Sequence, residues 1–554
     1  MFRNRNFQAA PVALEVKDLT ISLSGTGVGA QPVLDRVSLT IRHGETVCLV
    51  GESGSGKSVT SLAIMGLLPK NALAVKGGEI LLKGRNLLAL DAKAMRDLRA
   101  RKVSMIFQEP MTALNPVLRV GAQVEEVLEM HGDLTPHERR RHVLDMMDQV
   151  HLPDVERIYN SFPHQLSGGQ RQRIMIAMAL ILEPQLLIAD EPTTALDVTT
   201  QKQILSLIAE MQEKHGTAVL FITHDMGVVA DIADSVYVMK RGAVVEHAAV
   251  GTLLRTPKDE YSRKLLQAVP SLQPRVPRQD APREHVLSVK SLEKTYPLAG
   301  VRKPPTIAAT GVNFEIRRGR TLGIVGESGS GKSTVARCIM RLIDPTGGEI
   351  RVASKEIAKL SRRQLQPHRR SIQMVFQDPY RSLNPRWTVG ESIIEGPLNF
   401  GICREDALAH ARKLLDLVGL PADAIGRYPH QFSGGQRQRI AIARAVAMRP
   451  DVLVADEAVS ALDVSVQAQV LNLLDELQAQ LGIAILFITH DLRVAAQICD
   501  EVVVMQRGRI VEHGAASDVL SSPSHPYTRA LIEAAPGRGW DFANFRELAA
   551  ADVR

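Results

Sequence analysis

The chain has 554 residues, of which 45% are hydrophobic and 23% charged, and its formal net charge is +7. This length exceeds what one hydrophobic core usually organises, so two or more domains are expected. The composition is that of ordinary globular protein and excludes a disordered or fibrous chain. The small positive excess fits a phosphate-handling protein, a membrane-surface protein or a nucleic-acid binder equally well.

Neither the N-terminus nor the apolar runs predict a secreted or membrane-spanning chain. The start, MFRNRNFQAAPVALEV, has basic residues but no apolar core of a signal peptide, and the longest apolar run, Ile174–Leu182, has nine residues. We therefore expect a cytoplasmic location. The cysteines lie far apart with no CxxC pair, which argues against disulfides, zinc and iron–sulfur clusters. They are Cys48, Cys338, Cys403 and Cys499.

The chain contains the same series of motifs twice. GESGSGKS begins at Gly51 and again at Gly326, 275 residues later, whereas the SGGQ segments begin at Ser167 and Ser433, 266 residues apart. The motifs keep their order, and the second copy is nine residues shorter between these two motifs, as expected when loops shorten and the scaffold does not. We interpret the chain as two tandem copies of one domain.

The predicted boundaries follow from composition. We place domain 1 at residues 12–255, its C-terminal appendage and a linker at 256–285, domain 2 at 286–520, and a second appendage and tail at 521–554. The linker PSLQPRVPRQDAPRE contains four prolines and is expected to be extended and semi-rigid. Both appendages, TPKDEYSRKLLQAVP and SPSHPYTRALIEAAP, show a helical spacing of leucines.

Within each copy the pattern predicts an α/β fold. ETVCLVG and RTLGIVG are typical of buried strands that enter a glycine loop and then a helix. QLLIADE and DVLVADE end in carboxylates, and AVLFITHD and AILFITHD end in histidine. Ligands bind at such carboxyl ends of parallel strands. A helical pattern follows Gln108, with Val143, Met147 and Val150 on one face, so a helical subdomain interrupts each α/β core.

GESGSGKS predicts a phosphate-binding loop, because GxxxxGK[ST] after a strand wraps backbone N–H groups around phosphates. Lys57 and Lys332 reach the β- and γ-phosphates in this interpretation, and the Ser58 and Ser333 hydroxyls bind Mg²⁺. The expected nucleotide-binding residues are Gly51, Glu52, Ser53, Gly54, Ser55, Gly56, Lys57, Ser58 and Val59 in copy one, and Gly326, Glu327, Ser328, Gly329, Ser330, Gly331, Lys332, Ser333 and Thr334 in copy two.

Acidic residues after the next apolar strand predict the rest of a nucleoside triphosphatase site. Asp190 and Asp456 are candidates for a second Mg²⁺ contact. The adjacent Glu191 and Glu457 are candidate general bases or orienters of the attacking water.

Two further polar positions complete the predicted site in each copy. Gln108 and Gln377 follow apolar segments and are placed to contact both Mg²⁺ and the attacking water. His224 and His490 stand at strand ends and are candidates for a hydrogen bond to the γ-phosphate. Each would be uninformative alone and gains its meaning from the ordered set of motifs.

SGGQ predicts a further anion-binding helix start, because free N–H groups and the helix dipole point at the same place. With this motif the full series resembles the nucleotide-binding domain of ABC ATPases, over nearly the whole chain and twice. The resemblance implies ATP and Mg²⁺ as cofactors and a head-to-tail pairing in which the SGGQ helix of one domain closes on ATP held by the other. The residues concerned are Ser167, Gly168, Gly169 and Gln170 for the second site, and Ser433, Gly434, Gly435 and Gln436 for the first.

The resemblance also assigns residues outside the phosphate loops. Asp197 and Asp463, in the two ALDV segments, are expected at the interface between the domains. The family stacks adenine on an aromatic residue, for which Tyr296 is the candidate in copy two. Copy one has Leu23 at the matching place, and a lost stack costs about 1–3 kcal/mol by analogy with nucleic-acid binding.

Twin ATPase domains leave two classes of function open. One is the energising subunit of an importer whose membrane spans are separate chains, and the other is a soluble ABC ATPase that acts on ribosomes. EPMTALNP, DPYRSLNP and HPYTRALIEAAP resemble importers for dipeptides, oligopeptides, nickel and glutathione. That resemblance implies two permease subunits, a periplasmic solute-binding protein, no nucleic acid and a peripheral position on the cytoplasmic face of the inner membrane.

Overall fold

The computed structural model describes residues 7, 9–25, 31–108, 113–193, 196–276, 278, 284–297, 305–460 and 462–548. Part of the segment after Gln108 (109–112) and part of the linker (277, 279–283) lie outside these residues. The chain divides into two compact units. Unit 1 comprises residues 1–196, 200–269 and 536–554, and unit 2 comprises 197–199 and 270–535.

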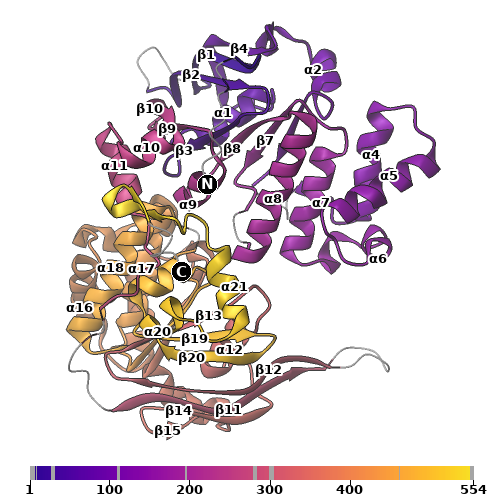
Figure 1. Ribbon diagram of the computed structural model, residues 1–554. Coiled ribbons are helices and arrows are strands. Elements are labelled where there is room, and N and C mark those ends of the chain that lie inside the picture. The colour runs from indigo at the N-terminus through magenta and orange to yellow at the C-terminus, as the bar shows by residue number, and fades with distance from the viewer. Residues whose placement is uncertain are drawn as a thin grey trace. The chain divides into compact units, whose positions relative to one another are not determined.

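Unit 1 contains an antiparallel sheet and a mostly parallel sheet (Figure 1). The antiparallel sheet has the order β2-β1-β4-β5, and the central sheet has the order β10-β9-β3-β8-β7-β6, in which only β10 is antiparallel to its neighbour. The strands are β1 (Val12–Leu23), β2 (Leu34–Arg42), β3 (Thr46–Val50), β4 (Leu73–Leu82), β5 (Arg85–Asn86), β6 (Val103–Ile106), β7 (Leu186–Asp190), β8 (Ala218–Ile222), β9 (Ser235–Lys240) and β10 (Ala243–Ala249).

Unit 2 repeats this arrangement. Its antiparallel sheet has the order β12-β11-β14-β15 and its central sheet the order β16-β17-β18-β13-β19-β20. The predicted α/β fold of two tandem domains is therefore confirmed. The strands are β11 (His285–Tyr296), β12 (Thr306–Arg317), β13 (Thr321–Val325), β14 (Gly347–Val352), β15 (Lys355–Glu356), β16 (Ile372–Val375), β17 (Val452–Asp456), β18 (Ala484–Ile488), β19 (Glu501–Gln506) and β20 (Arg509–Ala515).

Helices cover the central sheets and form the predicted helical insertion. In Figure 1, α4, α5 and α6 form a group beside α7. The predicted apolar face of the insertion is buried, with Val143 and Met147 at 0% exposure. The helices of copy one are α1 (Lys57–Ile64), η1 (Leu87–Ala89), α2 (Ala92–Leu98), α4 (Val120–His131), α5 (Pro136–Gln149), α6 (Val155–Tyr159), η2 (Pro163–Gln165), α7 (Gly168–Leu180), α8 (Val198–His215), α9 (Met226–Ile232), α10 (Val250–Arg255) and α11 (Glu260–Gln267).

Copy two has a similar series of helices. They are α12 (Lys332–Ile339), α13 (Arg362–Leu365), η3 (Gln366–Arg370), α14 (Pro379–Ser382), α15 (Val389–Asn399), α16 (Arg404–Leu417), η4 (Ala422–Gly426), η5 (Pro429–Gln431), α17 (Gly434–Val446), α18 (Val464–Leu481), α19 (Leu492–Ile498), α20 (Ala516–Ser521) and α21 (Pro526–Ala534). The short strands β21 (Trp540–Asp541) and β22 (Arg546–Glu547) flank η6 (Phe542–Asn544) after them.

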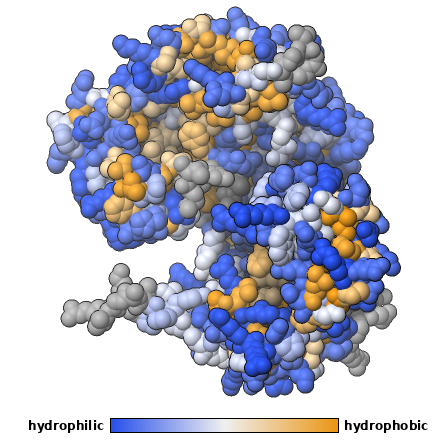
Figure 2. Space-filling view, turned by 180° about the vertical axis from the view of Figure 1, so that it is seen from behind, coloured by the Kyte–Doolittle hydropathy of each residue, from blue (hydrophilic) through white to orange (hydrophobic). Residues whose placement is uncertain are grey.

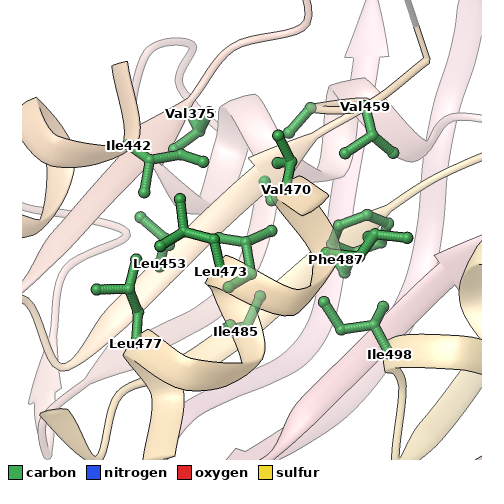
Figure 3. Close-up of a cluster of buried hydrophobic side chains, with 14 of the residues drawn as sticks. Val375, Ile442, Leu453, Val459, Val470, Leu473, Leu477, Ile485, Phe487 and Ile498 are labelled. Atoms are coloured by element: carbon green, nitrogen blue, oxygen red, sulfur yellow. The ribbon is translucent and has the colours of Figure 1, made fainter. Parts of the chain in front are cut away.

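The central strands are mostly apolar because both of their faces are buried. In β17, Leu453 packs with the core that contains α17 and α18, whereas Val454 packs with the core on the other face of the sheet. Successive side chains of a strand point to opposite faces, so a strand covered on both sides carries few polar residues. The exceptions, such as Thr46, Ser104 and Asp190, are themselves buried. Figure 3 shows the first of these cores, in which Phe487 lies close to Val459 and Val470.

The last described segment of the chain packs in unit 1. Gly537 N–H donates to Asp231 Oδ2 at 3.0 Å, and Arg255 Nη2 lies 2.7 Å from Glu547 Oε2. Trp540 and Phe542 are buried, at 9% and 5% exposure. The tail beyond Ala535 therefore contributes to the packing of a unit whose other residues all precede Pro270 in the chain.

The visible face in Figure 2 is mostly hydrophilic, with hydrophobic residues gathered in limited patches. Among the described residues, no helix combines the length and the hydropathy needed to cross a bilayer.

Replacing Phe487 with alanine is expected to lower the free energy of unfolding of unit 2 by about 3–5 kcal/mol, because the side chain is fully buried and leaves a cavity. Urea unfolding followed by circular dichroism measures the change. Phe400→Ala is the matched control, because Phe400 is 38% exposed, and it should shift the transition by less than about 1 kcal/mol. Equal shifts for the two variants would contradict the assignment of this core.

Candidate active sites

The loop between β3 and α1 is built for glycine. Gly51 has φ +148° and a Cβ there would lie 2.2 Å from the Met239 carbonyl oxygen. Gly56 has φ +105° and a Cβ there would lie 2.4 Å from Leu34 Cδ2. Both positions therefore lack the space and the backbone conformation for any other residue. This loop, residues 51–58, is called phosphate loop one.

Phosphate loop two, residues 326–333, has the same conformation. Gly326 has φ +148°, and a Cβ there would lie 2.3 Å from the Met505 carbonyl oxygen. Gly331 has φ +105°, and a Cβ there would lie 2.3 Å from the Ala308 carbonyl oxygen. Because the two loops agree so closely, the repeat in the sequence is also a repeat in backbone geometry.

The lysine of each loop points back across it. Lys57 Nζ donates to the Gly51 carbonyl at 2.7 Å and to the Glu52 carbonyl at 2.9 Å. Lys332 Nζ makes the same two bonds in loop two, at 2.7 and 2.8 Å. Both lysines are 5% exposed. Each ammonium group is therefore held inside the curve of its loop, where a bound phosphate would meet it.

The serine after each lysine meets the aspartate at the end of the neighbouring strand. Ser58 Oγ lies 3.3 Å from Asp190 Oδ1, and Ser333 Oγ lies 3.2 Å from Asp456 Oδ1. Burial raises the pKa of Asp190, and burial followed by the charge of Glu457 raises the pKa of Asp456. A buried carboxylate with a raised pKa gains from a nearby cation.

These oxygen donors fit a hard cation such as Mg²⁺, which prefers hydroxyl, carboxylate and phosphate oxygens. Among the described residues, no group of three or more His, Cys, Asp or Glu side chains could hold a metal ion. A cation beside Ser58 and Asp190 would therefore need further ligands from a bound phosphate or water, as is usual for Mg²⁺.

Glu191 lies between two polar side chains in copy one. Gln108 Nε2 donates to Glu191 Oε2 at 3.1 Å, and His224 Nδ1 lies 3.4 Å from Glu191 Oε1. The three residues follow β6, β7 and β8, whose carboxyl ends meet at one edge of the sheet. The structure thus brings together three residues that the sequence analysis singled out separately.

Copy two has the same group. Gln377 Nε2 donates to Glu457 Oε2 at 2.7 Å, and His490 Nδ1 lies 3.6 Å from Glu457 Oε1. Burial acts to raise the pKa of Glu457, but His490 and the charge of Lys332 outweigh it and lower the pKa. Burial acts to lower the pKa of His490, but the Glu457 carboxylate outweighs it and raises the pKa. The pair is therefore stabilised in its charged form.

Both glutamates adopt a left-handed backbone conformation, with φ +47° at Glu191 and +48° at Glu457. This conformation is uncommon for residues other than glycine and costs about 1 kcal/mol. A backbone hydrogen bond of 2.9 Å holds each one, from Glu191 N–H to the Ile222 carbonyl and from Glu457 N–H to the Ile488 carbonyl. The carboxylates of both residues accept from the glutamines that follow the neighbouring strands.

The SGGQ segments begin helices, as predicted. Ser167 Oγ accepts from Gln170 N–H at 3.2 Å, and Gln170 Oε1 accepts from Ser167 N–H at 3.0 Å. The same reciprocal pair joins Ser433 and Gln436, at 3.3 and 3.0 Å. Each glutamine side chain is thus bonded to the start of its own helix. The two glycines between the serine and the glutamine lie at the N-terminal, positive end of the helix dipole.

The remaining predicted residues lie at element ends. Tyr296 ends β11 and Leu23 ends β1, the equivalent strand, and both are exposed, at 38% and 49%. Asp463 directly precedes α18. Asp197 directly precedes α8 and accepts from Thr199 Oγ1 at 2.9 Å.

The sequence analysis missed residues that reach the site from elsewhere. Ser61 Oγ lies 3.3 Å from Asp190 Oδ2 in copy one, and copy two has Ala336 at that position. Tyr261 and Tyr527, in the appendages, contact the phosphate loops. The sequence did contain a signal for the two tyrosines, because tyrosine stands at the same place in DEYSR and HPYTR.

A glycine loop with an inward lysine, a Ser–Asp pair and a strained glutamate at the edge of a parallel sheet together define a phosphate-loop nucleoside triphosphatase, here in two copies. Two regions of the chain, residues 34–194 and 309–460, match the family model described as "ABC transporter", and together they exceed half of the chain. Residues 511–544 match the model "Oligopeptide/dipeptide transporter, C-terminal region". The chain belongs to the ABC transporter family and is an ATPase of that family.

Two relatives in sequence agree with this assignment. The glutathione import ATP-binding protein GsiA of Pectobacterium atrosepticum is 46% identical over 557 residues, covering 94% of this chain and 89% of the relative. The protein of the same name from Escherichia coli (strain K12) is 48% identical over 534 residues, covering 90% and 86%. A solved bacterial ABC transporter cassette, described as dimeric, is 32% identical over 43% of this chain and 98% of its own, with a TM-score of 0.39.

The charged pair of His490 and Glu457 predicts a pH-dependent contribution to stability. Because the pKa of His490 is raised, the contribution is complete below the ordinary histidine value of about 6.5 and is lost as the pH rises through the raised pKa. Because the pKa of Glu457 is lowered, the contribution is also lost at acid pH, as the pH falls through the lowered pKa of Glu457. The difference in Tm between wild type and His490→Gln should therefore be largest near about pH 5–6 and shrink as the pH rises through the raised pKa of His490.

Differential scanning fluorimetry across this pH range measures the effect. His137→Gln, at an exposed position, is the control and should show no pH-dependent difference. A difference between wild type and His490→Gln that is constant with pH would contradict the ion-pair assignment.

Proposed function

We propose that the chain is the ATP-hydrolysing subunit of an ABC importer that carries dipeptides, oligopeptides or glutathione across the bacterial inner membrane. The relatives named as glutathione import ATP-binding proteins, which cover most of the chain, support this proposal. The match to the C-terminal region of oligopeptide and dipeptide transporters supports it independently. The observation that carries the hydrolytic part is the Gln–Glu–His group beside both phosphate loops.

In this proposal each site divides the work among its own side chains. Lys57 and Lys332 neutralise the β- and γ-phosphates. Glu191 and Glu457 orient and deprotonate the attacking water, and the strained backbone keeps each carboxylate in place. His224 and His490 hydrogen-bond the γ-phosphate.

Ser58, Gln108 and Asp190 would hold Mg²⁺ in copy one, and Ser333, Gln377 and Asp456 in copy two. The bound cation supplies positive charge that offsets the charge developing on the transferred phosphoryl group. Gln108 and Gln377 already donate to the glutamates, so each glutamine side chain can also orient the water that its glutamate activates.

We further propose that each SGGQ helix start closes on the nucleotide held by the other copy. Ser433, Gly434 and Gly435 then complete the site of Lys57, and Ser167, Gly168 and Gly169 complete that of Lys332. Asp197 and Asp463 lie at the interface between the copies and relay the state of one site to the other. The γ-phosphate provides charge shared by two helix starts, so hydrolysis releases the pair.

The implied partners are two permease subunits in the membrane and a periplasmic solute-binding protein, with this chain bound peripherally at the cytoplasmic face. The segment after Gln377, which contains the short helix α14, is the candidate surface for a permease. The solute is expected to contact the permease and the binding protein and not this chain.

Replacing both glutamates with glutamine, Glu191→Gln with Glu457→Gln, is expected to lower kcat for ATP about 10²–10⁴-fold, because the base or orienter is lost while the shape is kept. Each single variant should lose at least half of the rate. Phosphate release at saturating ATP measures it. Glu210→Gln and Glu476→Gln, at exposed and equivalent positions of α8 and α18, are the matched controls. A single active-site variant with the full wild-type rate would show that its copy does not hydrolyse ATP.

Uptake of labelled glutathione, dipeptides and tripeptides tests the import function. The double variant Lys57→Ala/Lys332→Ala should abolish uptake of the transported solute, since neither site can hold ATP productively. The control Lys93→Ala/Lys413→Ala, at exposed positions in the two copies, should leave uptake unchanged. Unchanged uptake of every solute in the double variant would redirect the assignment to another solute, such as nickel, or to a ribosome-acting ATPase.

A further inference from the structure

A tyrosine from each C-terminal appendage reaches a phosphate loop. In unit 1, the Tyr261 hydroxyl in α11 accepts from Glu52 N–H at 3.0 Å, across 209 residues of sequence. In unit 2, the Tyr527 hydroxyl in α21 accepts from Glu327 N–H at 3.1 Å, across 200 residues. The same contact thus occurs twice, each time within one unit.

The tyrosine fixes a peptide group that the lysine of the phosphate loop also contacts. The carbonyl of Gly51 and the N–H of Glu52 belong to one planar peptide group. Its carbonyl accepts from Lys57 Nζ at 2.7 Å, and its N–H donates to Tyr261. The peptide group is therefore held from both ends, and its rotation would break both bonds.

The loop has little room to adjust around this group. Gly51 has φ +148° and lies against the backbone of Met239. Tyr261 is 8% exposed, so water does not readily replace its hydroxyl. A buried N–H that loses its acceptor is costly to leave unpaired.

The start of α11 is itself braced against β10. Asp259 Oδ1 accepts from Tyr261 N–H at 2.8 Å and so caps the helix. The Glu246 carboxylate accepts from Lys258 N–H at 2.8 Å and from Asp259 N–H at 3.1 Å. These bonds fix the direction in which Tyr261 leaves the helix.

Copy two builds the same brace from different residues. His525 Nδ1 takes the place of the aspartate and accepts from Tyr527 N–H at 3.2 Å. The Glu512 carboxylate accepts from Ser524 N–H at 2.7 Å and from His525 N–H at 3.2 Å. Burial raises the pKa of Tyr527 to about 12, so its hydroxyl is neutral at physiological pH. DEYSR and HPYTR therefore differ in sequence and agree in geometry, with the tyrosine unchanged.

We propose that Tyr261 and Tyr527 are positioning residues for ATP binding, through which each C-terminal appendage fixes the conformation of its phosphate loop. Without the hydroxyl, the peptide group between residues 51 and 52 loses one of the two bonds described above, so a rotation that moves the Gly51 carbonyl away from Lys57 breaks one bond instead of two. ATP must then order the loop as it binds, so the variants are expected to bind ATP more weakly. The chemical step, which depends on Glu191, is unaffected.

The test is the pair of variants Tyr261→Phe and Tyr527→Phe in the full chain. Each is expected to raise KM for MgATP about fivefold, the factor that one hydrogen bond of ordinary strength represents, with kcat within about twofold of wild type. Binding of a fluorescent ATP analogue should weaken by the same factor. Asp259→Ala removes the cap and keeps the hydroxyl, and it should raise KM in the same direction by less.

Tyr237→Phe is the matched control. The Tyr237 hydroxyl in β9 is also buried and accepts from a backbone N–H, that of Thr40, at 3.1 Å. This variant should lower Tm as much as Tyr261→Phe while leaving KM unchanged. An unchanged KM in Tyr261→Phe and Tyr527→Phe would overturn the proposal, as would an equal rise of KM in Tyr237→Phe.

Discussion

In both central sheets one row of residues pairs across the parallel strands. Ile106 pairs with Ala189, and Ala189 with Phe221. Gln108 and Glu191 each follow that row by two residues and His224 follows it by three, so all three leave the sheet at the same edge. Copy two has the same register, with Val375, Ala455 and Phe487 in the row. A slip of one residue in any strand would turn its buried side chains to the other face and would shift the polar residue that follows it along the edge.

This register also places two negative charges close together at the edge of the sheet. It brings Asp190 and Glu191 into a largely buried place beside the phosphate loop, where burial raises the pKa of Asp190. Ser58 and Lys57 offset part of the free-energy cost of burying these two carboxylates, as do the polar partners of Glu191. A cation with a bound phosphate would offset it further. The site is thus organised for a ligand that carries both positive and negative charge.

The two copies share most of the predicted site residues and differ in the residues that contact them. Ser61 contacts Asp190 in copy one, whereas copy two has Ala336. Leu23 and Tyr296 end equivalent strands, and an aspartate and a histidine cap equivalent helices. The two helix starts keep the same geometry because different side chains can accept the same backbone hydrogen bond.

Local signals in the sequence were enough to predict the phosphate loops, the SGGQ helix starts and the polar strand ends. Glycine conformations, helix caps and apolar strands depend on residues a few positions apart. The sequence alone did not reveal that Tyr261 reaches Glu52, that Ser61 reaches Asp190 or that Gly537 reaches Asp231, since these pairs are separated by 209, 129 and 306 residues. Only the pairing of strands and the packing of helices bring such residues together. A repeated motif marked Tyr261 and Tyr527 themselves, but nothing in the sequence indicates which distant residue each one contacts.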